Sequence, residues 1–281
     1  IGRIAYDIWG PLPITVRLPA LFAAILGLPT IYLLGRRWLG EGVGLLAALL
    51  LLFSHHHWYY SIRGRGYTLL ILVVMLAFCF FWQGWQHNRR RDGLAYVLFT
   101  VASGYTHFFG VFPVFSQGVF ALFDAARRRA WPPFFAFAAS AAASALILTG
   151  LYSPILGTIL GTASSQPFTT AFSRDLSNLF LFLARMGPSP FTYPDLIANL
   201  WLAAFLIGLA ITFWQQTRVA WLMALWLGLP LVYSFTVRAY VHDRFLLFVT
   251  GGYLLLVAAG FYAVASLLGV LCQRLRPVFP R

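Results

Sequence analysis

The sequence contains no lysine and little charge of any kind. All 20 basic residues are arginine, 7 residues are acidic, and charged residues make up 10% of the 281 positions. Because a soluble domain carries about a quarter charged residues, this composition argues against an ordinary soluble enzyme. The net charge of +13 does not indicate nucleic-acid binding either, since the arginines stand in short clusters between uncharged apolar runs. Such clusters are typical of membrane-protein loops.

Cysteine is also scarce, and no metal-ligand pattern is present. Cys79 and Cys272 lie inside or just after apolar runs, so they indicate neither a disulfide framework nor a metal site. The consecutive histidines His55, His56 and His57 would point about 100° apart on a helix, with no acidic residue near them. We therefore interpret them as membrane-interface residues. No metal site and no cofactor are predicted, and a requirement for a divalent metal stays open.

Apolar residues dominate what is present: 60% of the chain is hydrophobic, 18% is aromatic, and the mean hydropathy is +0.79. We predict an all-α polytopic membrane protein with about nine transmembrane helices in a single domain over residues 1–281. The predicted spans are about 17–35, 43–59, 67–85, two short helices within 89–129 with an apex at 105–110, 132–152, 195–214, 219–237 and 245–270. A short interfacial helix is expected within 1–16, and a long mixed connection at 153–194.

Nine spans divide the arginines into two groups of different character. One side holds twelve, mostly in runs: Arg36, Arg37, Arg89, Arg90, Arg91, Arg127, Arg128, Arg129, Arg218, Arg274, Arg276 and Arg281. The other side holds eight single, spaced arginines: Arg3, Arg17, Arg63, Arg65, Arg174, Arg185, Arg238 and Arg244. The positive-inside rule makes the first side cytoplasmic. The second side, with the 153–194 connection, is therefore expected to be extracytoplasmic.

Arg63 and Arg65 follow the histidine run and form a candidate phosphate site. An arginine at the bilayer centre costs roughly 3 kcal/mol, so the pair is expected near a membrane end. Gly64 and Gly66 favour a turn in which both arginines could face one ligand. Arginine binds phosphate through parallel charge-assisted hydrogen bonds. The alternative is that both side chains cap helices and reach lipid head groups.

Three further residues on the same side are candidates. His107 stands at the expected apex of the short hairpin, where it could serve a ligand or bond a backbone carbonyl at the helix end. Asp243 and Arg244 precede the last span, where they could hold an anionic head group or pair with each other or with Arg238.

Several segments in order resemble polytopic glycosyltransferases with the GT-C fold, of the protein-mannosyltransferase-like and aminoarabinose-transferase-like kind. They are RLPALF at 17–22, YLLGRR at 32–37, WYYSIRGRGY at 58–67, THFF at 106–109 and RFLL at 244–247. The resemblance extends over roughly residues 8–270. It implies an integral membrane enzyme of a cell envelope, in the plasma or inner membrane and of bacterial origin, that moves a sugar from a polyprenyl-phosphate carrier to a glycan, lipid or protein acceptor.

By position, the resemblance implies that Arg65, Tyr67, His107 and Arg244 contact the carrier phosphate or the substrate, with Arg63 and Asp243 beside them. Preorganised donors aimed at a departing phosphate would lower the barrier to transfer. Arg63 occupies the position of a family glutamate, so any role of that glutamate is lost or moved. The family's catalytic aspartate is expected upstream of Ile1, and Asp7 does not match it. No catalytic residue is therefore assigned within this fragment.

Two other functions fit parts of the sequence. A transporter or lipid flippase would require ionisable groups near the middle of the membrane and internal repeats, and neither is evident. A scaffold subunit without activity would be consistent with the missing aspartate. Because the ordered segments resemble a glycosyltransferase family, we expect a glycosyltransferase rather than either alternative.

Overall fold

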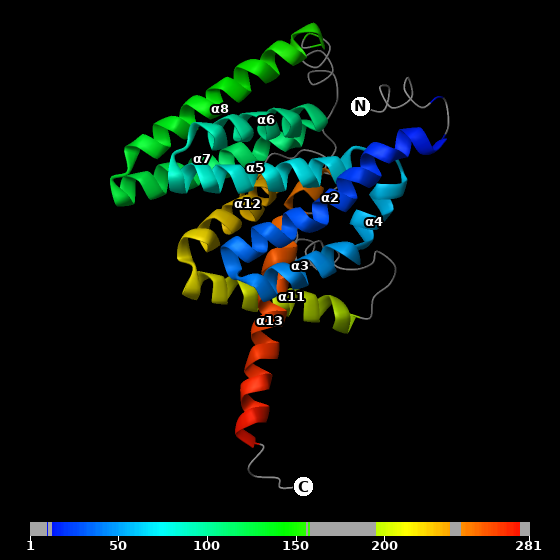
Figure 1. The fold of residues 1–281 in the computed structure, drawn as a ribbon, viewed down its shortest axis with the longest axis vertical. Helices are drawn as coiled ribbons and strands as arrows, with labels where there is room; N and C mark the ends of the chain where they lie inside the picture. The colour runs from blue at the N-terminus through cyan, green and yellow to red at the C-terminus, as the bar shows by residue number, and fades with distance from the viewer. Residues whose placement is uncertain (1–9, 11–12, 156, 158–194, 237–242, 276–281) are drawn as a thin grey trace.

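The computed structural model describes residues 10, 13–155, 157, 195–236 and 243–275, and the regular structure in these ranges is helical (Figure 1). The α-helices are α2 (Pro13–Leu39), α3 (Glu41–Leu52), α4 (His55–Ile62), α5 (Tyr67–His87), α6 (Arg90–Thr106), α7 (Phe112–Arg128), α8 (Trp131–Tyr152), α11 (Asp195–Gln215), α12 (Thr217–Thr236) and α13 (Thr250–Leu275). The 3-10 helices are η1 (Phe108–Val111), η2 (Ser153–Ile155) and η3 (Asp243–Val249). The prediction of an all-α polytopic fold is confirmed.

Five of these helical segments are long and apolar enough to cross a membrane. They are Arg17–Leu39, Tyr67–His87, Phe108–Arg128, Trp131–Ile155 and Leu246–Gln273. Three shorter apolar helices accompany them: Glu41–Leu52, Asn199–Gln215 and Thr217–Tyr233. The predicted number of nine spans stays a prediction.

α5 lies at the centre of the bundle, and it is the most deeply buried of the candidate spans (Figure 1). Its Phe78 ring stacks on Trp226 of α12, with ring centroids 3.8 Å apart. Beyond Ala259, α13 is mostly exposed and extends away from the other helices (Figure 1). The hydrophobic core therefore contains side chains from the first and the last third of the chain, and they pack around α5.

α2 and α3 form a tight hairpin that depends on glycine. The chain turns at Gly40, whose φ of 103° is in the left-handed region that favours glycine. A Cβ atom on Gly44 would lie 2.6 Å from the backbone oxygen of Tyr32, and one on Gly35 would lie 2.7 Å from the Cα of Gly44. Small residues thus let the two backbones touch, as in other membrane helix pairs.

Two of the arginine clusters form sharp turns. Asn88 ends α5 with a φ of 48°, and Arg129 ends α7 with a φ of 53°. Both residues adopt the left-handed conformation that commonly closes a helix. Each turn reverses the chain within two or three residues, so α5–α6 and α7–α8 are antiparallel neighbours.

Several predicted boundaries are correct and others are wrong. The short hairpin is confirmed, since α6 and α7 meet around His107. The predicted span 43–59 is wrong, because Ser54 is extended and separates α3 from α4. The first candidate span starts at Arg17 as predicted, but its helix α2 starts at Pro13, so residues 13–16 belong to α2 rather than to a separate interfacial helix. Residues 1–9 and 11–12 lie outside the described ranges.

The end of the chain shows a similar shift. The last span was predicted as 245–270, but its first residues form η3 and its α-helix continues to Leu275. The geometry changes from 3-10 to α just before the glycine pair Gly251 and Gly252, which packs against Trp226 of α12. The predicted connection at 153–194 lies outside the described residues beyond residue 157.

Candidate functional site

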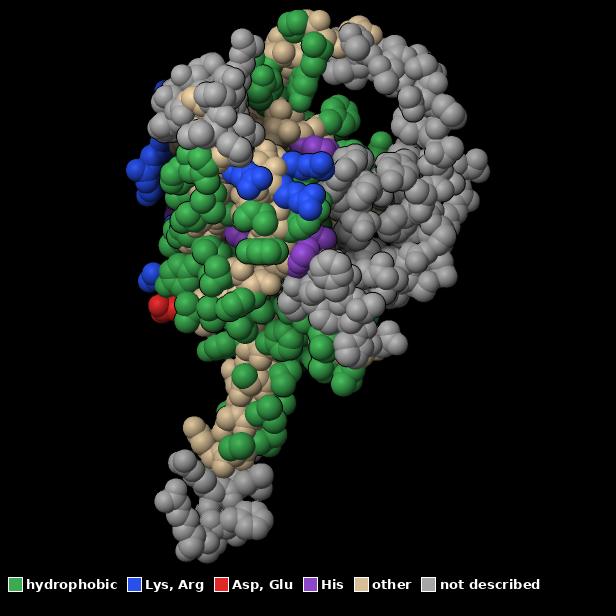
Figure 2. All heavy atoms as spheres, turned by 90° about the vertical axis from the view of Figure 1, so that its right-hand side faces the viewer, with side chains coloured by type: hydrophobic (Ala, Val, Ile, Leu, Met, Phe, Trp, Pro, Cys, Tyr) green, Lys and Arg blue, Asp and Glu red, His purple; other side chains and the backbone are tan. Residues whose placement is uncertain are grey.

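The turn between α4 and α5 presents Arg63 and Arg65. α4 ends at Ile62, Gly64 has a φ of 63°, and α5 begins after Gly66, so residues 63–66 leave the helical path. This confirms the predicted glycine-dependent turn. Both arginine side chains are exposed. Figure 2 shows basic and histidine side chains together on the face that includes α4 in Figure 1.

The two arginines have different surroundings. The guanidinium carbon of Arg63 lies 4.2 Å from the centre of the Tyr59 ring, a cation–π contact. Arg65 has no ion pair or side-chain hydrogen bond within the described residues, so its five donors are available to a ligand. Arg65 is therefore the better candidate for direct phosphate binding.

An aromatic row continues from this turn to the α6–η1 turn. Tyr59 contacts Tyr60 with ring centroids 5.1 Å apart, and Tyr60 contacts Tyr67 at 4.7 Å. Tyr67 then meets His107 at 5.9 Å. Two candidates that are 40 positions apart in the sequence are thus ring neighbours in the fold.

His107 caps the start of η1. Its Nδ1 accepts a hydrogen bond from the backbone N–H of Phe109 at 3.2 Å. A neutral imidazole then carries its proton on Nε2, because Nδ1 is the acceptor. The structural alternative for His107 is a bond to a backbone carbonyl at the helix end, whereas this hydrogen bond joins the imidazole to a backbone N–H group.

Glycine holds the two turns close together. A Cβ atom on Gly66 would lie 3.2 Å from the Cγ2 of Thr106, the residue before His107. The Ser103 hydroxyl donates to the Gly110 carbonyl at 2.8 Å and closes the α6–η1 turn. The backbones around Tyr67 and His107 are therefore fixed by local packing rather than by the two rings alone.

The segment that contains Asp243 and Arg244 packs beside this pair of turns. η3 contacts both α5 and η1, and Phe248 stacks on Phe112 with ring centroids 6.4 Å apart. The structure thus brings the backbone of Asp243 and Arg244 to the same end of the bundle. Their side chains lie outside the described residues.

The start of α2 completes this end of the molecule. The Thr68 hydroxyl donates to the Ala20 carbonyl at 2.9 Å, which places the RLPA segment beside the first turn of α5. Arg17 lies three residues before Ala20 and is exposed. We refer to this region, formed by Arg17, the 63–67 turn, His107 and η3, as the α4–α5 end.

His57 has a structural role that the sequence did not reveal. The position of the histidine run at the membrane interface stays a prediction, but His57 itself is buried between helices, with 5% of its surface exposed. Burial lowers the pKa of His57 to about 4, and a hydrogen bond to the Ala24 backbone partly opposes that shift. His57 is therefore neutral and holds α4 against α2. Ala24 and Gly27 lie on one face of α2. This pair of small residues is the sequence signal that could have indicated the helix face against which His57 packs.

The opposite end of the bundle contains a partly buried ion pair. Asp124 of α7 accepts two hydrogen bonds from Arg218 of α12, at 3.0 and 2.6 Å, and one from the indole of Trp85 at 2.8 Å. The sequence indicates Arg218 only as one of the arginines on the expected cytoplasmic side. The pair instead ties three helices together near the arginine-rich turns, and the lone acid inside an apolar segment was the available clue.

No group of three or more metal-ligating side chains occurs within the part of the chain that the structure describes. The carboxylates with described side chains, Glu41, Asp92 and Asp124, belong to the ends of helices that adjoin the arginine-rich turns. The α4–α5 end presents cationic and aromatic groups instead. That chemistry suits an anionic ligand with a ring or chain to pack on the tyrosines.

The fold and this end of the bundle define a polytopic α-helical membrane protein with arginine, tyrosine and histidine side chains gathered at one end. The family model for dolichyl-phosphate-mannose-protein mannosyltransferases matches residues 1–152, which is more than half of the chain. The chain belongs to this family, and the resemblance to GT-C glycosyltransferases is confirmed. No curated protein sequence matches the chain.

Two solved structures of ArnT from Cupriavidus metallidurans share the fold. The structure bound to undecaprenyl phosphate is 16% identical, with a TM-score of 0.67, and the match covers 92% of this chain and 48% of that chain. The apo structure is 14% identical, with a TM-score of 0.64 and the same coverage. The chain therefore spans about half the length of these proteins.

Proposed function

We propose that this chain provides the carrier-binding part of a membrane glycosyltransferase that moves a sugar from a polyprenyl-phosphate carrier to an acceptor. The observation that carries the proposal is the meeting of the 63–67 turn with His107 beside η3. This arrangement places Arg65 and the ring pair of Tyr67 and His107 at one end of the bundle. Family membership and the ArnT structure with bound undecaprenyl phosphate support it.

In this proposal each residue acts through a simple interaction. Arg65 forms a paired hydrogen bond with the carrier phosphate, and Arg244 contributes a second cation from η3. Positive charge there stabilises the phosphate as the sugar leaves it. Arg63 adds to the local potential while it stays over Tyr59. The sugar or the first isoprene units pack on the row from Tyr59 to Tyr67.

His107 and Asp243 have positioning roles in the proposal. The His107 ring is oriented by the hydrogen bond that its Nδ1 accepts from the backbone N–H of Phe109, and it lies beside the Tyr67 ring. Asp243 orients the cation of its neighbour Arg244. None of the three described carboxylates supplies the base for the acceptor hydroxyl, because they stand near the opposite, arginine-rich end.

Sidedness is part of the same proposal. We place the α4–α5 end on the extracytoplasmic face and the arginine-rich turns on the cytoplasmic face, as the positive-inside rule predicts. Polyprenyl-phosphate-linked sugars then reach the site from the outer leaflet. The acceptor is a glycan, lipid or protein on that side.

Transfer assays with the full-length protein test this function. Membranes are incubated with labelled polyprenyl-phosphate sugars and a panel of acceptors, and release of sugar from the carrier is measured. Loss of one charge-assisted hydrogen bond costs about 1.5–3 kcal/mol, so Arg65→Ala should lower kcat/KM roughly tenfold or more. Arg244→Ala should have an effect of similar size.

Arg36→Ala is the matched control, since Arg36 is exposed near the opposite end of α2. It should leave the rate of transfer unchanged. Activity that is insensitive to Arg65→Ala and Arg244→Ala would contradict the proposed site. Movement of the carrier across proteoliposomes without sugar transfer would instead support a flippase.

A further inference from the structure

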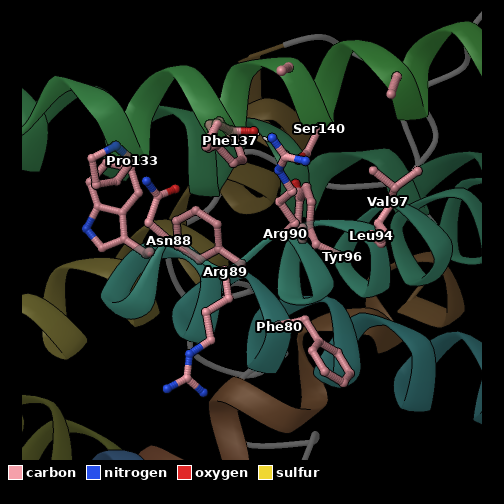
Figure 3. Close-up of a pocket in the computed structure, with 17 residues that line it drawn as sticks. Phe80, Asn88, Arg89, Arg90, Leu94, Tyr96, Val97, Pro133, Phe137 and Ser140 are labelled. Atoms are coloured by element: carbon pink, nitrogen blue, oxygen red, sulfur yellow. Dashed lines mark hydrogen bonds between the residues drawn. The ribbon is translucent and has the colours of Figure 1, made fainter.

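A groove at the arginine-rich end lies outside the proposed carrier site. It runs between the end of α5, the start of α6 and the side of α8, and its volume is about 390 Å³ (Figure 3). Its mouth contains Asn88, Arg89 and Arg90, and its walls are mostly aromatic and aliphatic. The groove is thus charged at the turn and apolar further along the helices.

The polarity of the groove follows from helical spacing. Arg90, Leu94 and Val97 are four and three residues apart, so they share one face of α6. Pro133, Phe137 and Ser140 follow the same spacing on α8. On α6 the cation stands at the turn and the apolar side chains follow toward the middle of the helix. An amphiphile with an anionic head and an apolar chain matches this order.

The arginines of the mouth are available for a ligand. Arg91 lies 3.7 Å from Asp92, but Arg89 and Arg90 have no ion pair or side-chain hydrogen bond within the described residues. Figure 3 shows Arg90 extending between α6 and α8 toward Ser140, whereas Arg89 extends away from α8. No acidic residue is among the described residues that line the groove. The cations at its mouth are therefore not paired with a carboxylate of the groove wall.

A second basic cavity shows why this absence matters. The cavity between α7 and α12, of about 450 Å³, contains Arg127, Arg128 and Arg218 but also Asp124. Asp124 pairs with Arg218 at 2.6 Å and lies 3.7 Å from Arg128. One of its three positive charges is thus balanced by a carboxylate within the cavity. Among its described lining residues, the α5–α6–α8 groove has no such carboxylate.

The shape of the groove is set by backbone packing. A Cβ atom on Gly93 would lie 3.3 Å from the Ser140 hydroxyl, so α6 and α8 approach closely at this point. α8 is the least buried candidate span, and its wall residue Ala139 is exposed. The groove therefore opens toward the surroundings of the bundle rather than toward its core.

We infer that the α5–α6–α8 groove binds one anionic glycerophospholipid. Its phosphate lies beside Arg90 at the turn, where Arg89 adds to the positive potential, and one acyl chain lies along Leu94, Val97 and Phe137. Basic pockets between transmembrane helices hold lipid head groups in this way. The site is separate from the carrier site, so it stands or falls independently of the transferase activity.

Lipid binding to the detergent-purified full-length protein tests the inference. The probe is fluorescent phosphatidylglycerol, with phosphatidylcholine as the zwitterionic comparison. Each arginine near a membrane surface contributes about 1 kcal/mol, so Arg89→Gln and Arg90→Gln should each raise the Kd about fivefold. Arg36→Gln removes the same charge at another turn and should leave the Kd unchanged.

A second pair of variants tests the chain-binding wall. Ala139→Phe fills the groove without changing charge and should weaken binding, whereas Ala142→Phe places the same ring on α8 outside the groove and should not. Equal losses in Arg36→Gln and Arg90→Gln would overturn the inference, as would equal binding of phosphatidylcholine. Unchanged binding in Ala139→Phe, or complete displacement of the probe by equimolar undecaprenyl phosphate, would overturn it as well.

Discussion

Arg63 and Arg65 are two positions apart, yet the fold gives them different chemistry. Arg63 lies over the Tyr59 ring, so part of its charge already has a partner. Arg65 stands on the same turn with no such contact within the described residues. A glycine on each side of Arg65 allows the turn to leave the helical path. The difference makes Arg65 the residue with which the carrier phosphate is expected to pair.

His57 gives a pH-dependent prediction at the residue scale. Its pKa is about 4 in the folded protein and near 6.5 when unfolded, so the unfolded chain binds more protons between these values. Stability is therefore full above about pH 6.5 and falls as the pH drops toward 4, by about 3 kcal/mol in total. Thermal unfolding in detergent across this range measures the loss.

His57→Gln should remove this part of the pH dependence, because the substituted side chain does not titrate. His87→Gln is the control, since His87 is exposed at the end of α5. If wild type and His57→Gln lose stability equally between pH 6.5 and 4, the assignment of a buried neutral His57 is wrong.

At the element scale, Gly44 is the contact point of the α2–α3 hairpin. A Cβ atom there would lie 2.6 Å from the Tyr32 carbonyl and 2.7 Å from the Arg36 nitrogen, and neither backbone atom can move without shifting a helix. Gly44→Ala should therefore destabilise the protein by about 2–3 kcal/mol. Unfolding of the variant by denaturant or heat measures the change.

Gly228→Ala is the matched control for that substitution. A Cβ atom on Gly228 of α12 has open space around it, and alanine is the better helix former by about 1 kcal/mol. The control should be neutral or stabilising. Equal destabilisation by both variants would contradict the close approach of α2 and α3.

The Asp124–Arg218 pair links α7 to α12 across 94 positions of the sequence. A double-mutant cycle with Asp124→Asn and Arg218→Gln should give a coupling energy of about 1–2 kcal/mol, because the carboxylate is buried but Arg218 is one-third exposed. The Asp124–Arg128 pair is longer, at 3.7 Å, and half exposed. Its coupling should be below about 0.5 kcal/mol. Equal couplings would show that the bidentate geometry does not matter.

At the scale of the whole molecule, the prediction concerns sidedness. In a Cys79→Ser, Cys272→Ser background, Phe108→Cys places a thiol on η1 and Gln216→Cys places one on the α11–α12 turn; both positions are exposed. A membrane-impermeant maleimide added to intact cells should label Phe108→Cys and spare Gln216→Cys until the membrane is opened. The reverse pattern would invert the proposed orientation.

The sequence alone determined the class of the protein and many of its elements. Charge content and apolar runs identify a polytopic membrane protein, because a bilayer excludes unpaired charge from its core. Asn88 and Arg129 stand within clusters that predict turns, and the structure has turns there. These features depend on the local composition of a single segment, so they do not require knowledge of how the segments pack together. The ordered motifs likewise led to the correct family.

Only the tertiary structure decided which residues meet. Tyr67 and His107 become neighbours because α5 and α6 are antiparallel and glycine lets their turns touch. Ser54 interrupts an apolar run that looked continuous, and His57 is buried because α4 then folds against α2. Asp124 finds Arg218 only when α7 and α12 pack together. Such contacts join segments that are distant in the chain, and the packing energy that selects them belongs to pairs of helices rather than to any one of them.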